Sequence, residues 1–172
     1  MDQEENILEP EKKHGWLISW LFDTNISIPK YVFRTGLISL IPSLFVSFLL
    51  SATGIINDKT GPEFAGPVIF NVIGMLIIGP PLETFLMIPI LKVLSFITKQ
   101  KIRLAIMSAF AWAILHSLAA PAWGLVIFWP FFVFSCCYLS WRQKSFWYAV
   151  LVTSCVHAFQ NTLPTIAYIA VS

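Results

Sequence analysis

The stretch from Trp123 to Trp141, which reads WGLVIFWPFFVFSCCYLSW, decides the fold of this chain. It contains no Asp, Glu, Lys or Arg, and its length is close to the roughly 20 apolar residues that a helix needs to cross a bilayer. Four further stretches are long and mostly apolar, so we expect spans near residues 34–56, 67–98, 103–120, 123–141 and 146–171. The sequence therefore predicts an all-α, polytopic membrane helix bundle with about five transmembrane helices.

The composition of the whole chain excludes an ordinary water-soluble domain. Of its 172 residues, 57% are hydrophobic and only 12% are charged, whereas soluble domains contain about 25% charged residues. The formal net charge of +2 is too small to indicate nucleic-acid binding, and three cysteines in apolar stretches offer no disulfide framework. The bilayer is therefore the first expected partner of the chain.

Residues 1–30 differ from the rest and are predicted to form a cytoplasmic or interfacial segment ahead of a transmembrane domain over residues 31–172. The acidic start and the lack of a small-residue cleavage site argue against a signal peptide. The apolar run at residues 16–22 is too short to span a bilayer and contains two Trp residues, so we expect it to lie in the membrane interface.

The basic residues predict the orientation of the spans. One set of span ends carries nine basic residues, and the other carries only Lys59. The positive-inside rule places the nine in the cytoplasm, with a cytoplasmic N-terminus and an external C-terminus. The short, compact chain suggests a bacterial source and therefore a multi-pass protein of the cytoplasmic (inner) membrane. The nine residues are Lys12, Lys13, Lys30, Arg34, Lys99, Lys101, Arg103, Arg142 and Lys144.

Three ionisable side chains are predicted to lie deep in the bilayer, namely Glu83, His116 and His157. Lys92 also falls within a span, but it is close enough to the cytoplasmic end for its ammonium to reach the surface. At about 1.5 Å per residue, the three lie roughly 24, 20 and 20 Å from the nearest basic residues. Because a charged group in hydrocarbon is costly, three such groups at one depth predict a shared site.

Asn161 completes the predicted site, because it follows His157 by four positions and shares its helix face. A carboxylate beside imidazole can activate a water, alone or through a bound metal. Amide and imidazole N–H groups can stabilise a developing oxyanion. Glu83, His116 and His157 could also hold a divalent metal such as zinc, because two His and a carboxylate form a familiar zinc set. The expected reaction is hydrolysis of an amide bond within or near the membrane.

Structural interpretations of the same residues remain open. A single intramembrane His or Asn is more often a partner in an interhelical hydrogen bond. Glu83 follows the Gly-Pro-Pro at residues 79–81, a predicted helix break, and could merely bond the freed backbone groups. Pro89 offers a second break point. Asn71 and Gln160 are expected to hydrogen-bond between helices.

The order of these motifs resembles the CPBP family of intramembrane proteases, which includes CAAX-processing and bacteriocin-processing (Abi) enzymes. The family pattern is EExxxR, then FxxxH, then HxxxN or HxxxD. Residues 112–116 read WAILH, with Trp for Phe, and residues 157–161 read HAFQN, a full match. The first motif keeps Glu83, but Thr84 and Ile88 stand where the pattern has Glu and Arg. The likeness covers about residues 67–170.

The resemblance implies an intramembrane endopeptidase that acts on a membrane-associated protein or peptide. It implies that Glu83 and His116 activate a water and that His157 and Asn161 hold the oxyanion, with or without a metal. The departures at Thr84 and Ile88 favour an alternative, a catalytically silent relative that binds a membrane partner or confers immunity to a peptide toxin. A small transporter or channel is a third hypothesis, against which the lack of an internal repeat argues.

Overall fold

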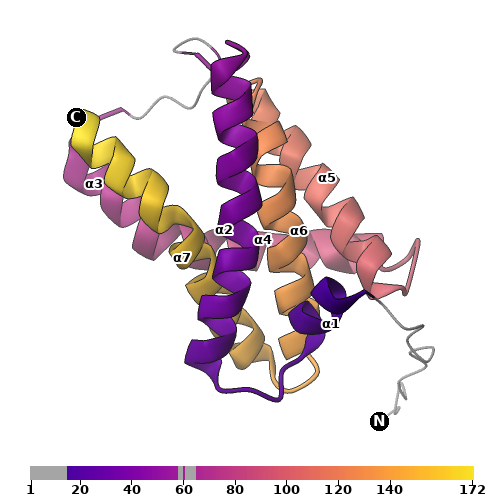
Figure 1. The fold of residues 1–172 in the computed structure, drawn as a ribbon. Helices are drawn as coiled ribbons and strands as arrows, with labels where there is room; N and C mark the ends of the chain where they lie inside the picture. Colours follow the sequence, from indigo (N-terminus) through magenta and orange to yellow (C-terminus); the bar gives the residue numbers. More distant parts are fainter. Residues whose placement is uncertain (1–14, 58–59, 61–64) are drawn as a thin grey trace.

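The computed structural model describes residues 15–57, 60 and 65–172, and the regular structure within these ranges is entirely helical. Figure 1 shows the arrangement of the helices. The elements in chain order are α1 (Trp16–Phe22), α2 (Ile28–Ala52), α3 (Val68–Ile73), the π-helix η1 (Gly74–Ile78), α4 (Gly79–Leu94), α5 (Lys101–Ala119), α6 (Trp123–Trp141) and α7 (Phe146–Val171). The predicted all-α polytopic bundle is confirmed.

Four segments in the described part of the chain are both long enough and apolar enough to cross a membrane, so the chain is an integral membrane protein. They are Ile28–Ala52, Val68–Leu94, Lys101–Ala119 and Trp123–Trp141, and they coincide with the first four predicted spans. The fifth predicted span is the 26-residue helix α7. It is not among the four because His157, Gln160 and Asn161 make it less apolar.

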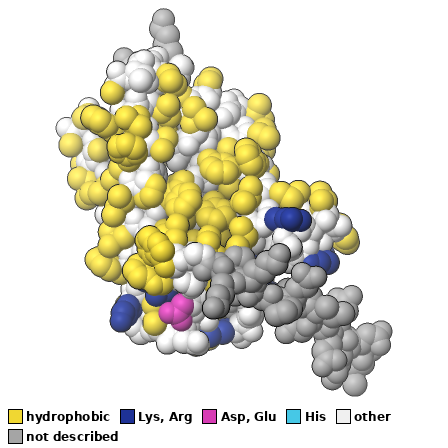
Figure 2. All heavy atoms as spheres, turned by 45° about the vertical axis from the view of Figure 1, so that its right-hand side comes forward, with side chains coloured by type: hydrophobic (Ala, Val, Ile, Leu, Met, Phe, Trp, Pro, Cys, Tyr) yellow, Lys and Arg dark blue, Asp and Glu magenta, His cyan; other side chains and the backbone are white. Residues whose placement is uncertain are grey.

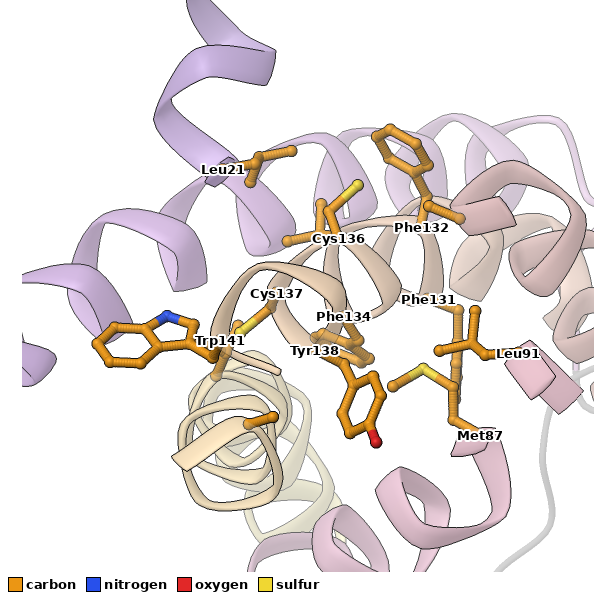
Figure 3. Packing of buried hydrophobic residues seen from close by; sticks show 14 of the residues in the cluster. Leu21, Met87, Leu91, Phe131, Phe132, Phe134, Cys136, Cys137, Tyr138 and Trp141 are labelled. Atoms are coloured by element: carbon orange, nitrogen blue, oxygen red, sulfur yellow. The ribbon is translucent and has the colours of Figure 1, made fainter. Parts of the chain in front are cut away.

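Helix α6 lies at the centre of the bundle. It contacts α1, α2, α4, α5 and α7, and every residue from Phe131 to Tyr138 is buried. A helix that is apolar on all sides is typically enclosed by other helices. Cys136 and Cys137 lie in this core and are completely buried, as Figure 3 shows, so their role is packing and not contact with lipid.

The outer surface of the bundle is largely apolar, and many large hydrophobic side chains are exposed on it. Figure 2 shows these side chains over the middle of the molecule and the Lys and Arg side chains towards its lower part. This distribution suits helices whose outer faces contact lipid and whose ends reach the polar interface.

The described basic residues gather at one end of the bundle, which we call the basic end. Lys101 Nζ lies 5.6 Å from the centroid of the Phe22 ring, Lys144 donates to the Thr24 carbonyl, and Arg34 pairs with Asp23. The start of α2, the α4–α5 connection and the α6–α7 connection therefore all meet near α1. The predicted orientation stays a prediction, and Lys12, Lys13 and Lys59 lie outside the described residues.

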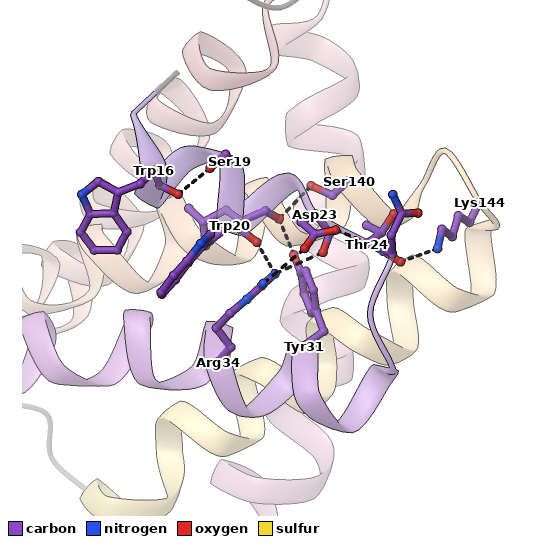
Figure 4. A network of polar contacts seen from close by, with 11 residues as sticks. Trp16, Ser19, Trp20, Asp23, Thr24, Tyr31, Arg34, Ser140 and Lys144 are labelled. Atoms are coloured by element: carbon purple, nitrogen blue, oxygen red, sulfur yellow. Dashed lines mark hydrogen bonds and ion pairs between the residues drawn. The ribbon is translucent and has the colours of Figure 1, made fainter. Parts of the chain in front are cut away.

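Helix α1 closes the basic end. Leu21 is completely buried, and its carbonyl accepts hydrogen bonds from the Tyr31 hydroxyl (2.6 Å) and from Ser140 Oγ (3.2 Å). Arg34 donates to the Trp20 carbonyl and pairs with Asp23 at 3.4 Å, as Figure 4 shows. The two Trp side chains of α1 are exposed, as expected for an interfacial segment. The burial of Leu21 adds a contact with the core that was not predicted.

The second span changes from α-helix to π-helix at Gly74–Ile78, immediately before the predicted Gly-Pro-Pro break point, and Pro80 and Pro81 lie in the first turn of α4. The Gly79 N–H donates to the Gly74 carbonyl, five residues earlier, as in a π-helix. A Cβ on Gly79 would lie only 2.7 Å from that carbonyl oxygen, so this position requires Gly. In Figure 1, α3 runs beside α7, whereas α4 passes behind α2 and α6. No break occurs at Pro89, which lies inside the continuous helix α4.

Candidate functional site

All four predicted site residues line one cavity of about 470 Å³. Glu83 comes from α4, His116 from α5, and His157 and Asn161 from α7. The volume lies within the range of about 300–1,000 Å³ that is typical of ligand pockets. The structure therefore brings together side chains that are up to 78 positions apart in the sequence, from Glu83 to Asn161.

Glu83 and His157 lie close together in the cavity wall. Glu83 Oε2 and His157 Nε2 are 3.9 Å apart, too far for a hydrogen bond but close enough for an electrostatic contact. The His157 side chain is 7% exposed and the Glu83 side chain 29% exposed. Within the described residues Glu83 has no hydrogen-bond partner, so its carboxylate is available to a bound molecule.

His116 occupies the last turn of α5, and its Nδ1 lies 3.0 Å from the Trp112 carbonyl oxygen. A carbonyl can only accept, so Nδ1 carries the proton and Nε2 of the neutral ring presents a lone pair. In the described part of the chain no ion pair joins His116 to Glu83; the imidazole close to Glu83 is His157.

Aromatic side chains surround both imidazoles. Phe134 stacks on His157, with ring centroids 4.4 Å apart. Phe131 contacts both imidazoles, at 5.2 Å from His116 and 5.7 Å from His157. Trp123 meets His116 edge-on at 5.0 Å. These rings hold the imidazoles in apolar surroundings on one side while the cavity borders them on the other.

Asn161 holds the helix break in place. Its Nδ2 donates to the Met75 carbonyl at 2.8 Å. In a regular helix that carbonyl would accept from Gly79, but the Gly79 N–H is bonded to Gly74. The next residue, Pro80, has no N–H to offer. The Met75 carbonyl is therefore freed by the π-helix and the proline, and the Asn161 amide satisfies it with one of its two N–H groups.

The expected interhelical hydrogen bonds of Asn71 and Gln160 are confirmed. Gln160 Nε2 donates to Ser43 Oγ (3.1 Å), which joins α7 to α2. Asn71 Nδ2 donates to the Tyr168 hydroxyl (2.8 Å), which joins α3 to α7. Both residues also line the cavity, which was not predicted. For Gln160 the signal was present, because it lies three positions after His157 and so shares its helix face.

The two departures from the family's first motif have structural roles. Thr84 is 2% exposed; its hydroxyl donates to the Pro80 carbonyl (2.7 Å) and accepts from Ser154 Oγ (3.3 Å). This contact joins α4 to α7 where the family pattern has a second Glu. Ile88 packs against the hydrophobic core where the pattern has Arg.

The predicted metal set is not assembled in this geometry. Across the described residues, no three His, Cys, Asp or Glu side chains lie close enough together to hold an ion. Glu83 and His157 are near each other, but among the described residues no ion pair joins His116 to Glu83. Zinc binding by these three residues therefore stays a prediction.

Comparison with known proteins assigns no family. No family model, no curated protein and no solved structure matches this chain. The resemblance to the CPBP proteases therefore rests on the motifs at Glu83, at residues 112–116 and at residues 157–161.

Proposed function

We propose that this chain is an intramembrane endopeptidase of the cytoplasmic membrane of a bacterium, and that it hydrolyses a peptide bond of a membrane-associated protein or peptide. The observation that carries the proposal is the 3.9 Å approach of the Glu83 carboxylate to the His157 imidazole in a cavity that His116 and Asn161 also line. Ionisable groups within membrane helices are costly, and they usually mark a functional path or site.

The proposed reaction begins with Glu83 as the general base. Its carboxylate takes a proton from a water molecule, and the water oxygen bonds to the carbonyl carbon of the substrate. The Nε2 lone pair of His116 accepts a hydrogen bond from the same water and helps to orient it. The carbonyl electron pair moves onto oxygen, which becomes the oxyanion of a tetrahedral intermediate.

The oxyanion is stabilised by the His157 N–H and by the second amide N–H of Asn161, the first being bonded to Met75. The intermediate then collapses as the carbon–nitrogen bond breaks. The leaving nitrogen receives the proton from Glu83, which restores the carboxylate. The products are one new carboxyl terminus and one new amino terminus.

The decisive comparison is between the wild type and Glu83→Gln, which keeps the size of the side chain but removes the base. Lys92→Gln is a matched control, because it neutralises a charge in the exposed last turn of the same helix. With matched expression in cells that lack the gene, new protein termini are profiled across the membrane proteome. We expect termini that appear with the wild type and Lys92→Gln and disappear with Glu83→Gln. Identical termini with all three chains would refute the proposal.

A second candidate is a catalytically silent relative that binds a membrane peptide, for example an immunity protein against a peptide toxin. The observation that favours it is the engagement of Asn161 by Met75, together with the structural role of Thr84. It predicts that Glu83→Gln leaves protection against the toxin intact and that no Glu83-dependent termini appear. Loss of protection in Glu83→Gln at unchanged protein level would contradict it.

A further inference from the structure

The cavity occupies only the half of the bundle that is remote from the basic end. Along α6 its lining runs from Trp123, the first residue of the helix, to Phe134, which is about 16 Å at a rise of 1.5 Å per residue. The lining also includes Ser43 and Ser47 of α2 and Ile56, which follows the last residue of that helix. The cavity thus extends to the level where the helices end.

The half of the bundle nearer the basic end is packed with buried side chains. Below Phe134, α6 continues with Cys136 and Cys137, which are completely buried, and ends at the buried Trp141 (Figure 3). At the basic end itself, Leu21 of α1 and Tyr31 of α2 are completely buried and hydrogen-bonded to each other (Figure 4). Along α6, these buried side chains separate the cavity from the basic end.

We propose that the substrate enters the cavity from the membrane face opposite the basic end, and that it is an apolar, extended peptide segment presented at that face. This inference rests on the proposed function. By the positive-inside rule the face is the external one. The substrates are then membrane-inserted or exported peptides whose cleaved bond lies towards the outer leaflet, and not peptides attached to the cytoplasmic surface.

The walls of the cavity suit such a segment. Trp123, Phe131 and Phe134 provide apolar surface for side chains. An extended backbone in this environment needs hydrogen-bond partners, because lipid offers none. Ser47 lines the cavity, and its hydroxyl can accept a hydrogen bond from a backbone N–H of the peptide.

The direction of access is tested with single cysteines. The parent is Cys155→Ser, which removes the exposed native cysteine and keeps the two that are completely buried. Ser47→Cys reports on the cavity, and Gln143→Cys reports on the exposed α6–α7 connection at the basic end. A membrane-impermeant maleimide is applied to right-side-out and inside-out vesicles, with the parent as the background.

We expect Ser47→Cys and Gln143→Cys to react in opposite vesicle orientations, with at least a tenfold difference in rate for each. Reaction of both cysteines in the same orientation would overturn the proposal. A second outcome would also overturn the proposal. In it, Ser47→Cys does not react with the impermeant maleimide in either vesicle orientation but reacts rapidly with a membrane-permeant maleimide, which indicates entry from the lipid.

The substrate class is tested by the positions of the termini that depend on Glu83. We expect them on the face from which Ser47→Cys is labelled, and termini on the Gln143 face would overturn the assignment. The two parts are distinguishable, because labelling does not require activity and should be unchanged in Glu83→Gln. Opposite labelling without any Glu83-dependent termini would refute the endopeptidase and leave the direction of access standing.

Discussion

The bond from Asn161 to Met75 allows a quantitative prediction. In Asn161→Ala the Met75 carbonyl loses its donor, and neither Gly79 nor Pro80 can replace it. An unpaired acceptor costs about 1–3 kcal/mol when it is fully buried, and the partly buried Met75 carbonyl should fall in the lower part of that range. Hydrogen bonds between membrane helices contribute about 0.6 kcal/mol on average and up to about 1.7 kcal/mol. Because no backbone donor is within reach, we expect a loss of about 1.5 kcal/mol in the free energy of unfolding.

For a chain of this size, 1 kcal/mol corresponds to about 2–4 °C in Tm, so the Tm of Asn161→Ala should fall by about 3–6 °C. The measurement is thermal unfolding in detergent micelles, followed by far-UV circular dichroism. The matched control is Thr162→Ala, which removes a hydroxyl whose one partner among the described residues is the Ala158 carbonyl of its own helix. This control should stay within about 0.5 kcal/mol of the wild type, as surface substitutions usually do.

Equal Tm values for Asn161→Ala and Thr162→Ala would refute the reasoning, because they would mean that the Met75 carbonyl does not depend on the amide. Asn161→Asp sharpens the test. An ionised carboxylate can only accept, so it would face the Met75 carbonyl oxygen without a hydrogen bond. We therefore expect Asn161→Asp to be destabilised at least as much as Asn161→Ala.

Three further predictions concern packing and the closure of the basic end. Gly124→Ala places a Cβ about 2.3 Å from the Ala113 carbonyl oxygen, so α5 and α6 must separate, which we expect to cost about 1–3 kcal/mol and to lower the Tm. The control is Gly15→Ala, where a Cβ has nothing within 4 Å and the Tm should stay unchanged. Equal Tm values for the two variants would contradict the close approach of α5 and α6. Thr84→Glu places a larger, charged side chain at a position that is 2% exposed. Size-exclusion chromatography should therefore show less folded protein for Thr84→Glu than for the control Thr84→Ser. Equal yields of the two variants would show that the position accepts a carboxylate. Arg34→Met removes the hydrogen bond to the Trp20 carbonyl and the ion pair with Asp23. We expect hydrogen exchange of the α1 amides to accelerate several-fold, while exchange in α6 stays unchanged. Unaltered exchange in α1 would show that the burial of Leu21 is enough to hold α1 in place without Arg34.

The spans were predictable because the bilayer imposes one simple requirement, a run of apolar residues of sufficient length. The first span differs most: α2 begins at Ile28, six residues before the predicted start at residue 34. Pro29 in the first turn favours a helix start there, and Lys30 and Arg34 lie on the helix at the polar end of the bundle. The prediction erred because basic residues were taken as the limit of the helix.

The candidate site was predictable only as a set of residues at one depth. Counting along the helices placed Glu83, His116 and His157 at one level, and the structure has all three in the lining of one cavity. Their mutual geometry could not be read from spacing, because the rotation of one helix against another depends on packing. An irregularity near residues 79–81 followed from the missing proline N–H groups, and the structure has it as the π-helix at Gly74–Ile78. The donor that satisfies Met75, however, lies 86 positions further along the chain. The catalytic roles of these residues stay predictions.

The polarity of α7 has a consequence for how the protein is made. His157, Gln160 and Asn161 lower the tendency of this helix to enter lipid on its own, and it is synthesised after α2 to α6. We therefore expect α7 to insert against helices that are already in the membrane, with its polar side chains passing directly to partners such as Ser43 and Met75. The cavity would then be completed in the final step of biogenesis, and a nascent chain that lacks α7 would have Glu83 without the imidazole beside it.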